Sequence, residues 1–164
     1  MSKRLTGKHA IVTGGSSGIG KEIVKSFANE NCIISVFDIN PIEINSDNIK
    51  YFHCDITSEE SLIKSINNAI KFMGSLEILV NNAGIGVAGD IMSTKIDDWH
   101  KTLNVNLTGT YLATKHSLNH LIDSKNGSIV NIASVAGVVA VKDRFAYTTS
   151  KGGVIALTKS VALD

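Results

Sequence analysis

The sequence TGGSSGIG, residues 13–20, decides the fold of this chain. It directly follows a short apolar run, His9 to Val12, and directly precedes a stretch with helical periodicity, Ile19 to Asn29. Glycines let the backbone approach a pyrophosphate and adopt positive φ, and the free amides at the start of a helix attract its anionic oxygens. A strand, a glycine-rich turn and a helix in this order predict a binding site for the phosphates of a dinucleotide.

Two other interpretations use the same residues. The spacing differs from the GxGxxG fingerprint, because three residues separate Gly14 from Gly18, and a glycine turn without a ligand remains an alternative. The segment Gly15 to Lys21 also fits the GxxxxGK opening of an NTPase P-loop. Glu22 opposes that interpretation, because it stands where Ser or Thr would ligate Mg²⁺ and its carboxylate would repel phosphates.

The rest of the chain alternates short apolar runs with helical stretches, which predicts an α/β fold, a doubly wound Rossmann-type parallel sheet. The predicted strands are His9–Val12, Cys32–Phe37, Ile49–His53, Leu76–Val80 and Ser128–Ile132. The predicted helices are Ile19–Asn29, Ser58–Phe72, Asp97–Ile122 with a break, and Tyr147–Leu163, and Thr57 with Glu60 predicts a capping box before the second. The segment Ile39–Asn48, which contains Pro41, is too short for a full helix.

The composition predicts one globular domain over residues 1–164. The chain has 43% hydrophobic residues, and 16 basic against 15 acidic side chains give a formal charge of +1, which argues against nucleic acid or an anionic membrane as a partner. The N-terminal segment has only a short apolar run, so we expect a cytoplasmic protein without a signal peptide or membrane span. Cys32 and Cys54 are then expected to be reduced thiols.

An acidic residue ends the second predicted strand. Asp38 lies 18 residues after Gly20, close to the distance at which a carboxylate accepts hydrogen bonds from the ribose hydroxyls of NAD. The 2′-phosphate of NADP would meet this carboxylate, and Ile39 and Asn40 supply no compensating cation. Asp38 therefore predicts NAD over NADP, with a capping or solvent-facing Asp as the alternative.

The chain resembles the short-chain dehydrogenase/reductase family in five motifs that occur in the family's order. They are the TGxxxGxG loop at Thr13–Gly20, the NNAG segment at Asn81–Gly84, Asn106 in a VNL context, Ser134, and the YxxxK pair Tyr147 and Lys151. The resemblance spans essentially the whole chain. It implies an enzyme that transfers a hydride between NAD(H) and a secondary alcohol or carbonyl compound, with a sugar or polyol as one candidate substrate.

The chemistry of the YxxxK pair agrees with this resemblance. Tyr147 and Lys151 are spaced i, i+4, so they share one face of a helix, and the ammonium can favour the phenolate form of the tyrosine. Taken alone, a Tyr and a Lys at this spacing are usually a surface pair. The resemblance implies that Tyr147 takes or gives the alcohol proton, Ser134 hydrogen-bonds the substrate oxygen, Lys151 also holds the nicotinamide ribose, and Asn106 supports a water relay.

The resemblance also implies which residues contact the cofactor. The glycine loop would contribute Gly14, Ser16, Ser17, Gly18, Ile19 and Gly20, Asp55 and Ile56 would border the adenine, and Asn82, Ala83 and Gly84 would line the adenosine side. We expect no metal site, because Ser117 follows His116 where a HExxH motif would have Glu, although His116 and His120 share a helix face.

The predicted fold is truncated. A doubly wound sheet has six strands in the order 3-2-1-4-5-6, and this sequence stops in the helix after the fifth. In the family the remaining part supplies further strands and most of the substrate pocket, so we expect a missing C-terminal segment or chain as a partner, in addition to a homo-oligomer through helices 97–122 and 147–163. The alternative function is a cofactor-binding or interaction module without turnover.

Overall fold

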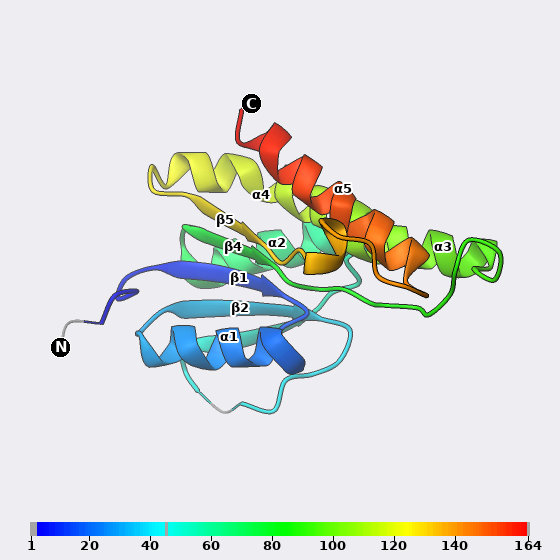
Figure 1. The fold of residues 1–164 in the computed structure, drawn as a ribbon. Helices are drawn as coiled ribbons and strands as arrows, with labels where there is room; N and C mark the ends of the chain where they lie inside the picture. The colour runs from blue at the N-terminus through cyan, green and yellow to red at the C-terminus, as the bar shows by residue number, and fades with distance from the viewer. Residues whose placement is uncertain (1–2, 45, 164) are drawn as a thin grey trace.

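A parallel five-stranded sheet forms the centre of the molecule. The computed structural model describes residues 3–44 and 46–163. The strands are β1 (His9–Thr13), β2 (Ile33–Asp38), β3 (Ile49–His53), β4 (Ile78–Asn81) and β5 (Ser128–Asn131), and their order across the sheet is β3-β2-β1-β4-β5 (Figure 1). This order confirms the first five positions of the doubly wound arrangement.

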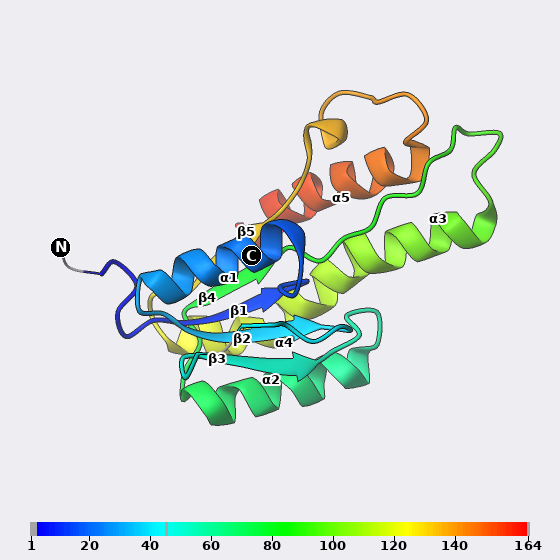
Figure 2. The same cartoon turned by 90° about the horizontal axis from the view of Figure 1, so that it is seen from below.

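Helices cover both faces of the sheet (Figure 2). They are α1 (Gly18–Asn29), α2 (Glu59–Met73), α3 (Ile96–Leu103), α4 (Gly109–Asp123) and α5 (Phe145–Val161). Helix α1 packs on β1 and β2 from one face, whereas α2 and α4 pack on the opposite face and against each other. The hydrophobic core is accordingly split into two clusters, one with Val24 of α1 and the other with Leu62 of α2 and Leu112 of α4. In the described part of the chain, no helix combines the length and apolar character that a membrane crossing requires.

Strands β2, β3 and β5 lie within one residue of their predicted ends, and so do helices α1 and α2. Strand β4 begins at Ile78 rather than at Leu76. Helix α5 begins at Phe145 rather than at Tyr147, and it ends at Val161. No helix forms in the described residues between β2 and β3, as the short segment with Pro41 predicts. Cys32 and Cys54 are both free and buried.

The predicted capping box at Thr57 and Glu60 is wrong. Ser58 is the N-cap of α2, and its hydroxyl oxygen accepts a hydrogen bond of 3.2 Å from the backbone N–H of Ser61. The Thr57 hydroxyl instead donates to the carboxylate of Asp55 at 2.7 Å. The oxygen of Ser58, and not that of Thr57, accepts the backbone N–H at the start of α2, so the cap lies one residue further along the chain.

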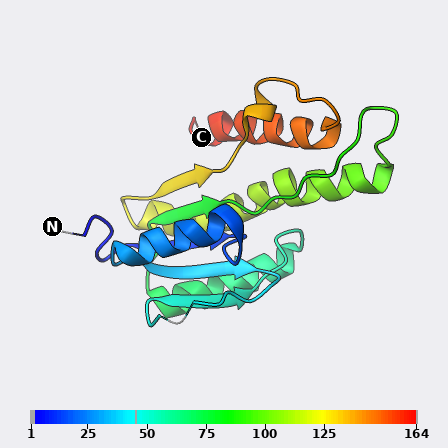
Figure 3. The same cartoon turned by 60° about the horizontal axis from the view of Figure 1, so that its bottom comes forward.

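The predicted break in the long helical stretch is a π-helical turn. The turn η1 (Asn104–Thr108) joins α3 to α4 without a gap, as the continuous helical rod in Figure 3 shows. Buried Asn106 lies inside this turn. Such turns insert one extra residue into a helix and occur often at functional sites.

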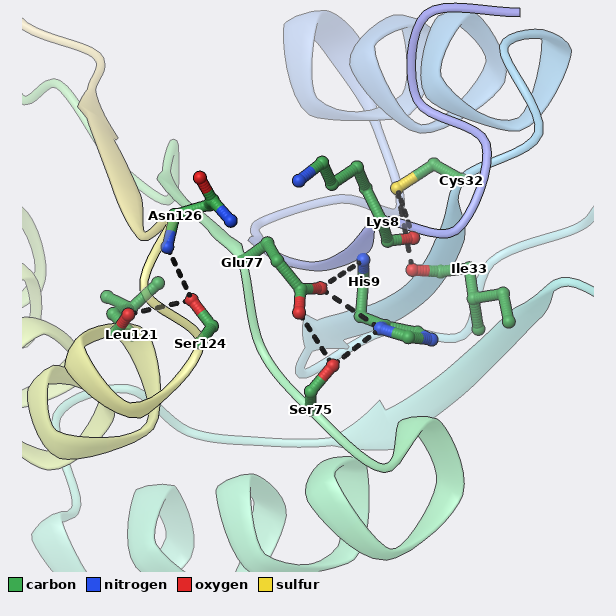
Figure 4. A network of polar contacts seen from close by, with 9 residues as sticks. All are labelled: Lys8, His9, Cys32, Ile33, Ser75, Glu77, Leu121, Ser124 and Asn126. Carbon is green, nitrogen blue, oxygen red and sulfur yellow. Dashed lines mark hydrogen bonds and ion pairs between the residues drawn. The ribbon is translucent and has the colours of Figure 1, made fainter.

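A polar cluster joins the amino ends of β1 and β4 (Figure 4). The carboxylate of Glu77 accepts hydrogen bonds from the His9 backbone N–H at 2.8 Å and from the Ser75 hydroxyl at 2.7 Å, and it lies 3.0 Å from the His9 ring nitrogen Nδ1. Burial alone would raise the pKa of Glu77, but the hydrogen bonds from Ser75 and His9 outweigh it, so the pKa is lowered. Burial, with the nearby Glu77 charge, raises the pKa of the Cys32 thiol to about 12.

Candidate active site

A cleft of about 1000 Å³ lies beyond the carboxyl ends of the strands. In open parallel sheets, ligands bind at this edge, where the strand order reverses between β1 and β4. The loops that follow β1, β2, β3, β4 and β5 all contribute to its wall, and so do α3, η1 and the first turns of α5. The cleft is therefore the natural place for a ligand as long as a dinucleotide.

The glycine loop after β1 requires glycine at two positions. Gly14 has φ of +62°, and a Cβ atom there would lie 2.7 Å from the Cα of Ala83. A Cβ on Gly20 would collide with the carbonyl oxygen of Gly14 and the side-chain amide of Asn82. The N-cap of α1, Ser17, makes no side-chain capping bond, and the first turn of α1 contains no acidic residue. The first amides of α1 are thus available to an anion, and this cradle fits the pyrophosphate of a dinucleotide.

Asn82 holds the glycine loop against the end of β4. Its side-chain amide donates to the carbonyl oxygens of Thr13 at 3.1 Å and Gly14 at 2.9 Å. In return, the hydroxyl oxygen of Thr13 accepts hydrogen bonds from the backbone N–H groups of Asn82 and Ala83, both at 3.1 Å. These four bonds fix the loop in the shape that the cradle needs.

The carboxylate of Asp38 lies at the end of β2 and faces the same loop. One oxygen accepts a hydrogen bond from the backbone N–H of Ser16, and the other from that of Asn40, both at 3.0 Å. Asp38 also lines the cleft, so its remaining acceptor capacity points toward a ligand. A ribose diol, which offers two hydroxyl donors, fits this carboxylate.

Tyr147, Lys151 and Ser134 line the cleft together. The ammonium of Lys151 donates to the carbonyl oxygen of Ile132 at 2.5 Å and lies 5.9 Å from the centre of the Tyr147 ring. Lys151 is only 5% exposed, and burial lowers its pKa. The Ser134 oxygen accepts a bond from the Ala136 N–H at 3.1 Å, which leaves the hydroxyl proton free to be donated. Tyr147 and Ser134 thus offer hydroxyl donors to a ligand in the cleft.

Asn106 is fully buried and does not line the cleft. Its side-chain oxygen accepts a hydrogen bond of 2.8 Å from the Ile85 backbone N–H. Its side-chain NH2 group donates to the Ile85 backbone carbonyl and to the Ser150 hydroxyl, both at 2.9 Å. The Ser150 hydroxyl in turn donates to the Tyr147 carbonyl at 2.7 Å. Asn106 thus ties the wall of the cleft at Ile85 to helix α5.

Most of the predicted site residues come together. The cleft is lined by Gly14, Ser17, Gly18, Ile19, Asp38, Asp55, Ile56, Asn82, Ala83, Gly84, Ser134, Tyr147 and Lys151. Ser16, Gly20 and Asn106 are not among the lining residues. Ser16 instead supports the wall, because its hydroxyl donates to the carbonyl oxygen of Asn40 at 2.6 Å.

Several lining residues were missed by the sequence analysis. They include Phe37, Cys54, Ile85, Gly86, Lys101, Val105 and Arg144. A signal was present for Arg144, because it stands only three residues before Tyr147 in the sequence. Lys101 had no comparable signal. The described residues contain no group of three or more His, Cys, Asp or Glu side chains placed to hold a metal ion.

Comparisons with known proteins agree with this geometry. Residues 8–164 match the model of the family described as short chain dehydrogenase. The chain is 35% identical over 168 residues to the mitochondrial borneol dehydrogenase of Lavandula x intermedia, covering 99% of this chain and 65% of that protein. The ligand-free aldohexose dehydrogenase of Thermoplasma acidophilum is similar in structure, with a TM-score of 0.95 and 39% identity, covering 100% of this chain and 64% of that one.

A solved structure with a bound nucleotide is also similar. The structure of NAD⁺-bound xylitol dehydrogenase has a TM-score of 0.91 and 33% identity, with 99% of this chain and 66% of that one covered. The chain therefore spans about two thirds of the length of the proteins it matches.

Proposed function

Because the chain belongs to the short-chain dehydrogenase family, we propose that it forms the nucleotide-binding and catalytic part of an oxidoreductase that interconverts a secondary alcohol and a carbonyl compound with NAD. One observation carries the proposal. Tyr147, Lys151 and Ser134 line the same cleft as the glycine loop and Asp38. A proton donor, a buried cation and a dinucleotide cradle in one cleft suit this chemistry better than simple nucleotide binding.

Each of these side chains has a defined task in the proposed reaction. Ser134 donates a hydrogen bond to the substrate oxygen, and the Tyr147 phenol takes the proton from an alcohol or gives it to a carbonyl. The Lys151 ammonium stabilises the phenolate by its charge, and Asn106 positions Ile85 and, through Ser150, helix α5. When bound, NAD supplies the acceptor for the hydride of the carbinol carbon.

The preference for NAD over NADP rests on Asp38. Its carboxylate lies where the adenosine ribose would be held, and it would repel a 2′-phosphate. The cleft residues that follow it, Ile39 and Asn40, carry no positive charge. The NAD⁺-bound xylitol dehydrogenase among the similar structures supports the same cofactor.

The names of similar proteins suggest several classes of alcohol as the substrate. An aldohexose and a xylitol dehydrogenase favour a sugar or polyol, and a borneol dehydrogenase extends the range to other secondary alcohols. We further propose that the protein assembles as a homo-oligomer through α4 and α5. The exposed apolar side chains Tyr111 and Ile122 of α4 suit a contact between copies.

Replacing Tyr147 by Phe tests the proposal. In the protein expressed from its full coding sequence, Tyr147→Phe should lower the rate of alcohol oxidation about 100-fold or more while leaving NAD affinity nearly unchanged, because the phenol acts in proton transfer. Steady-state kinetics and calorimetric titration with NAD measure the two effects. Tyr111→Phe is the matched control, because Tyr111 does not line the cleft and the change keeps the apolar ring that the proposed contact between copies would use.

Two outcomes would contradict the proposal. One is an unchanged rate in Tyr147→Phe. The other is a wild-type protein that binds NAD but turns over no alcohol from a panel of sugars, polyols and terpene alcohols, which would favour a cofactor-binding module.

A further inference from the structure

Two cationic side chains line the cleft without a place in the proposed chemistry. They are Lys101 from α3 and Arg144, the N-cap residue of α5. Among residues 3–44 and 46–163, no ion pair and no side-chain hydrogen bond engages either group. The acidic lining residues are Asp38, the last residue of β2, and Asp55, which follows β3. The cleft therefore carries acids near one edge of the sheet and unpaired cations on α3 and α5.

The backbone on both sides of Arg144 is hydrogen-bonded to Gly89. Gly89 donates its N–H to the Asp143 carbonyl and accepts a bond from the Phe145 N–H, both at 3.0 Å. The Phe145 ring stacks on Trp99 of α3, with ring centres 5.4 Å apart. Asp143 has φ of +58°, in the left-handed region that Asp adopts more readily than most residues other than glycine. Arg144 is thus presented to the cleft by a rigid support rather than by a mobile loop.

Arg144 lies next to the proposed reaction centre. It is the N-cap residue of α5, three residues before Tyr147, and its own backbone, with φ of −135° and ψ of 34°, is not helical. Both line the cleft. A substrate whose hydroxyl contacts Tyr147 therefore lies in the same cleft as the Arg144 side chain.

We propose that Arg144 binds an anionic group of the substrate, so that the substrate is an alcohol carrying a carboxylate or a phosphate several bonds from the reacting carbon. This inference rests on the proposed function. The planar guanidinium can form two parallel hydrogen bonds to either anion. Lys101 adds a second positive charge in the same cleft.

The anion that Arg144 binds belongs to the substrate rather than to the cofactor. The strand order β3-β2-β1-β4-β5 places Asp38 and Asp55 toward one edge of the sheet, whereas Ser134 follows β5 at the other edge. Ser134 and Tyr147 mark the substrate end of the cleft, and Arg144 precedes Tyr147 on the same helix. The glycine loop, with its own free amides, receives the pyrophosphate between the two ends.

Matched pairs of charged and neutral substrates test this inference on the protein from its full coding sequence. The carboxylate pair is 5-hydroxyhexanoate and its methyl ester, and the phosphate pair is glucose 6-phosphate and glucose. In at least one pair the anion should have a kcat/KM about tenfold or more above that of the neutral partner. The pair that shows the difference identifies the anion as a carboxylate or a phosphate.

Variants assign the difference to Arg144. Arg144→Gln should raise the KM for the anion about tenfold, with kcat and the neutral partner little changed, and Arg144→Lys should restore part of the loss. Lys142→Gln is the control, since this exposed cation on the same loop is not among the residues that line the cleft.

The outcomes separate this inference from the proposed function. Equal kcat/KM within both pairs, with Arg144→Gln unchanged, would overturn the inference while the proposed function stands. An equal loss for charged and neutral partners in Arg144→Gln would overturn it too, because it would indicate a structural role. Absence of any turnover that depends on Tyr147 would overturn both.

Discussion

The backbone N–H of Ser16 donates a hydrogen bond of 3.0 Å to the carboxylate of Asp38. The residue expected to hold the ribose therefore also supports the phosphate-binding loop, and the second carboxylate oxygen is engaged by the Asn40 N–H. A change at this position acts on cofactor choice and on loop geometry at once. The two effects can be separated by the choice of replacement.

Asp38→Asn should weaken the preference for NAD. The amide oxygen can still accept the Ser16 N–H, so the bond to the glycine loop is kept, although the amide nitrogen cannot accept the Asn40 N–H. The negative charge that opposes a 2′-phosphate is gone. We expect the ratio of NAD to NADP affinity to fall about tenfold, which corresponds to about 1.4 kcal/mol. Calorimetric titrations with both nucleotides measure the ratio. Asp38→Ala, which also removes the loop contact, should weaken binding of both, and an unchanged ratio in Asp38→Asn would argue against the ribose contact.

Gly20→Ala should abolish NAD binding. The added methyl group would collide with the carbonyl oxygen of Gly14 and the amide of Asn82, so the loop must move. Gly152→Ala is the control, because its Cβ would lie 3.5 Å from the Gly137 oxygen, an ordinary contact. As a replacement inside α5, it should leave binding intact and stabilise the fold by about 0.5–1 kcal/mol. Normal NAD affinity in Gly20→Ala would refute the close approach.

Glu77→Gln should lower the free energy of unfolding at pH 7 by about 1–3 kcal/mol. The carboxylate now accepts hydrogen bonds from the His9 N–H and the Ser75 hydroxyl. In the variant, the NH2 group of Gln would face one of these two donors, and that hydrogen bond would be lost. Because the folded pKa of Glu77 is lowered, its stabilisation is complete above the unfolded value near pH 4.5 and is lost as the pH falls through the folded value. The gap between wild type and variant should therefore shrink below pH 4.

Urea denaturation at several pH values measures that gap. Glu43→Gln, in the exposed connection between β2 and β3, should show no such difference at any pH. A gap for Glu77→Gln that stays constant from pH 7 to pH 3 would exclude the charge of Glu77 as its cause.

Asn106→Ala should reduce both stability and activity. The Ile85 N–H and carbonyl would lose their buried partners, which costs about 1–3 kcal/mol for each unsatisfied group. Loss of the hydrogen bonds that Asn106 makes to Ile85 and Ser150 should also lower kcat, because these bonds hold the wall of the cleft against α5. Thermal unfolding and steady-state kinetics report the two effects. Asn104→Ala, in the same turn but exposed, should change neither by a comparable amount.

The sheet and the cofactor cradle were readable from the sequence because their signals are local. A buried parallel strand is a continuous apolar run, and the glycine loop has a fixed spacing between strand and helix. These two patterns predicted the strand order and the position of Asp38 beside the loop. The NNAG and YxxxK motifs likewise identify residues that do line the cleft, such as Asn82 and Tyr147.

What the sequence could not provide depends on contacts between distant segments. Lys101 reaches the cleft only because α3 packs against α5, a contact that no spacing predicts. The burial of Asn106 depends on partners at Ile85 and Ser150, far away in the chain. The cap prediction for α2 failed for a different reason, since Thr57 and Ser58 are adjacent residues that can both cap a helix, and their spacing in the sequence did not distinguish them.

The π-helical turn η1 changes the direction in which the side chains of α3 point relative to those of α4. Its extra residue turns everything that precedes it by about 100° relative to a regular helix. This rotation lets α3 face α5 and the cleft while α4 faces α2 and β4. Removing one residue from Asn104–Thr108 would give a more regular helix, yet it would point Trp99 away from Phe145. The site therefore requires a fixed number of residues between α3 and α4, and not only suitable side chains on each helix.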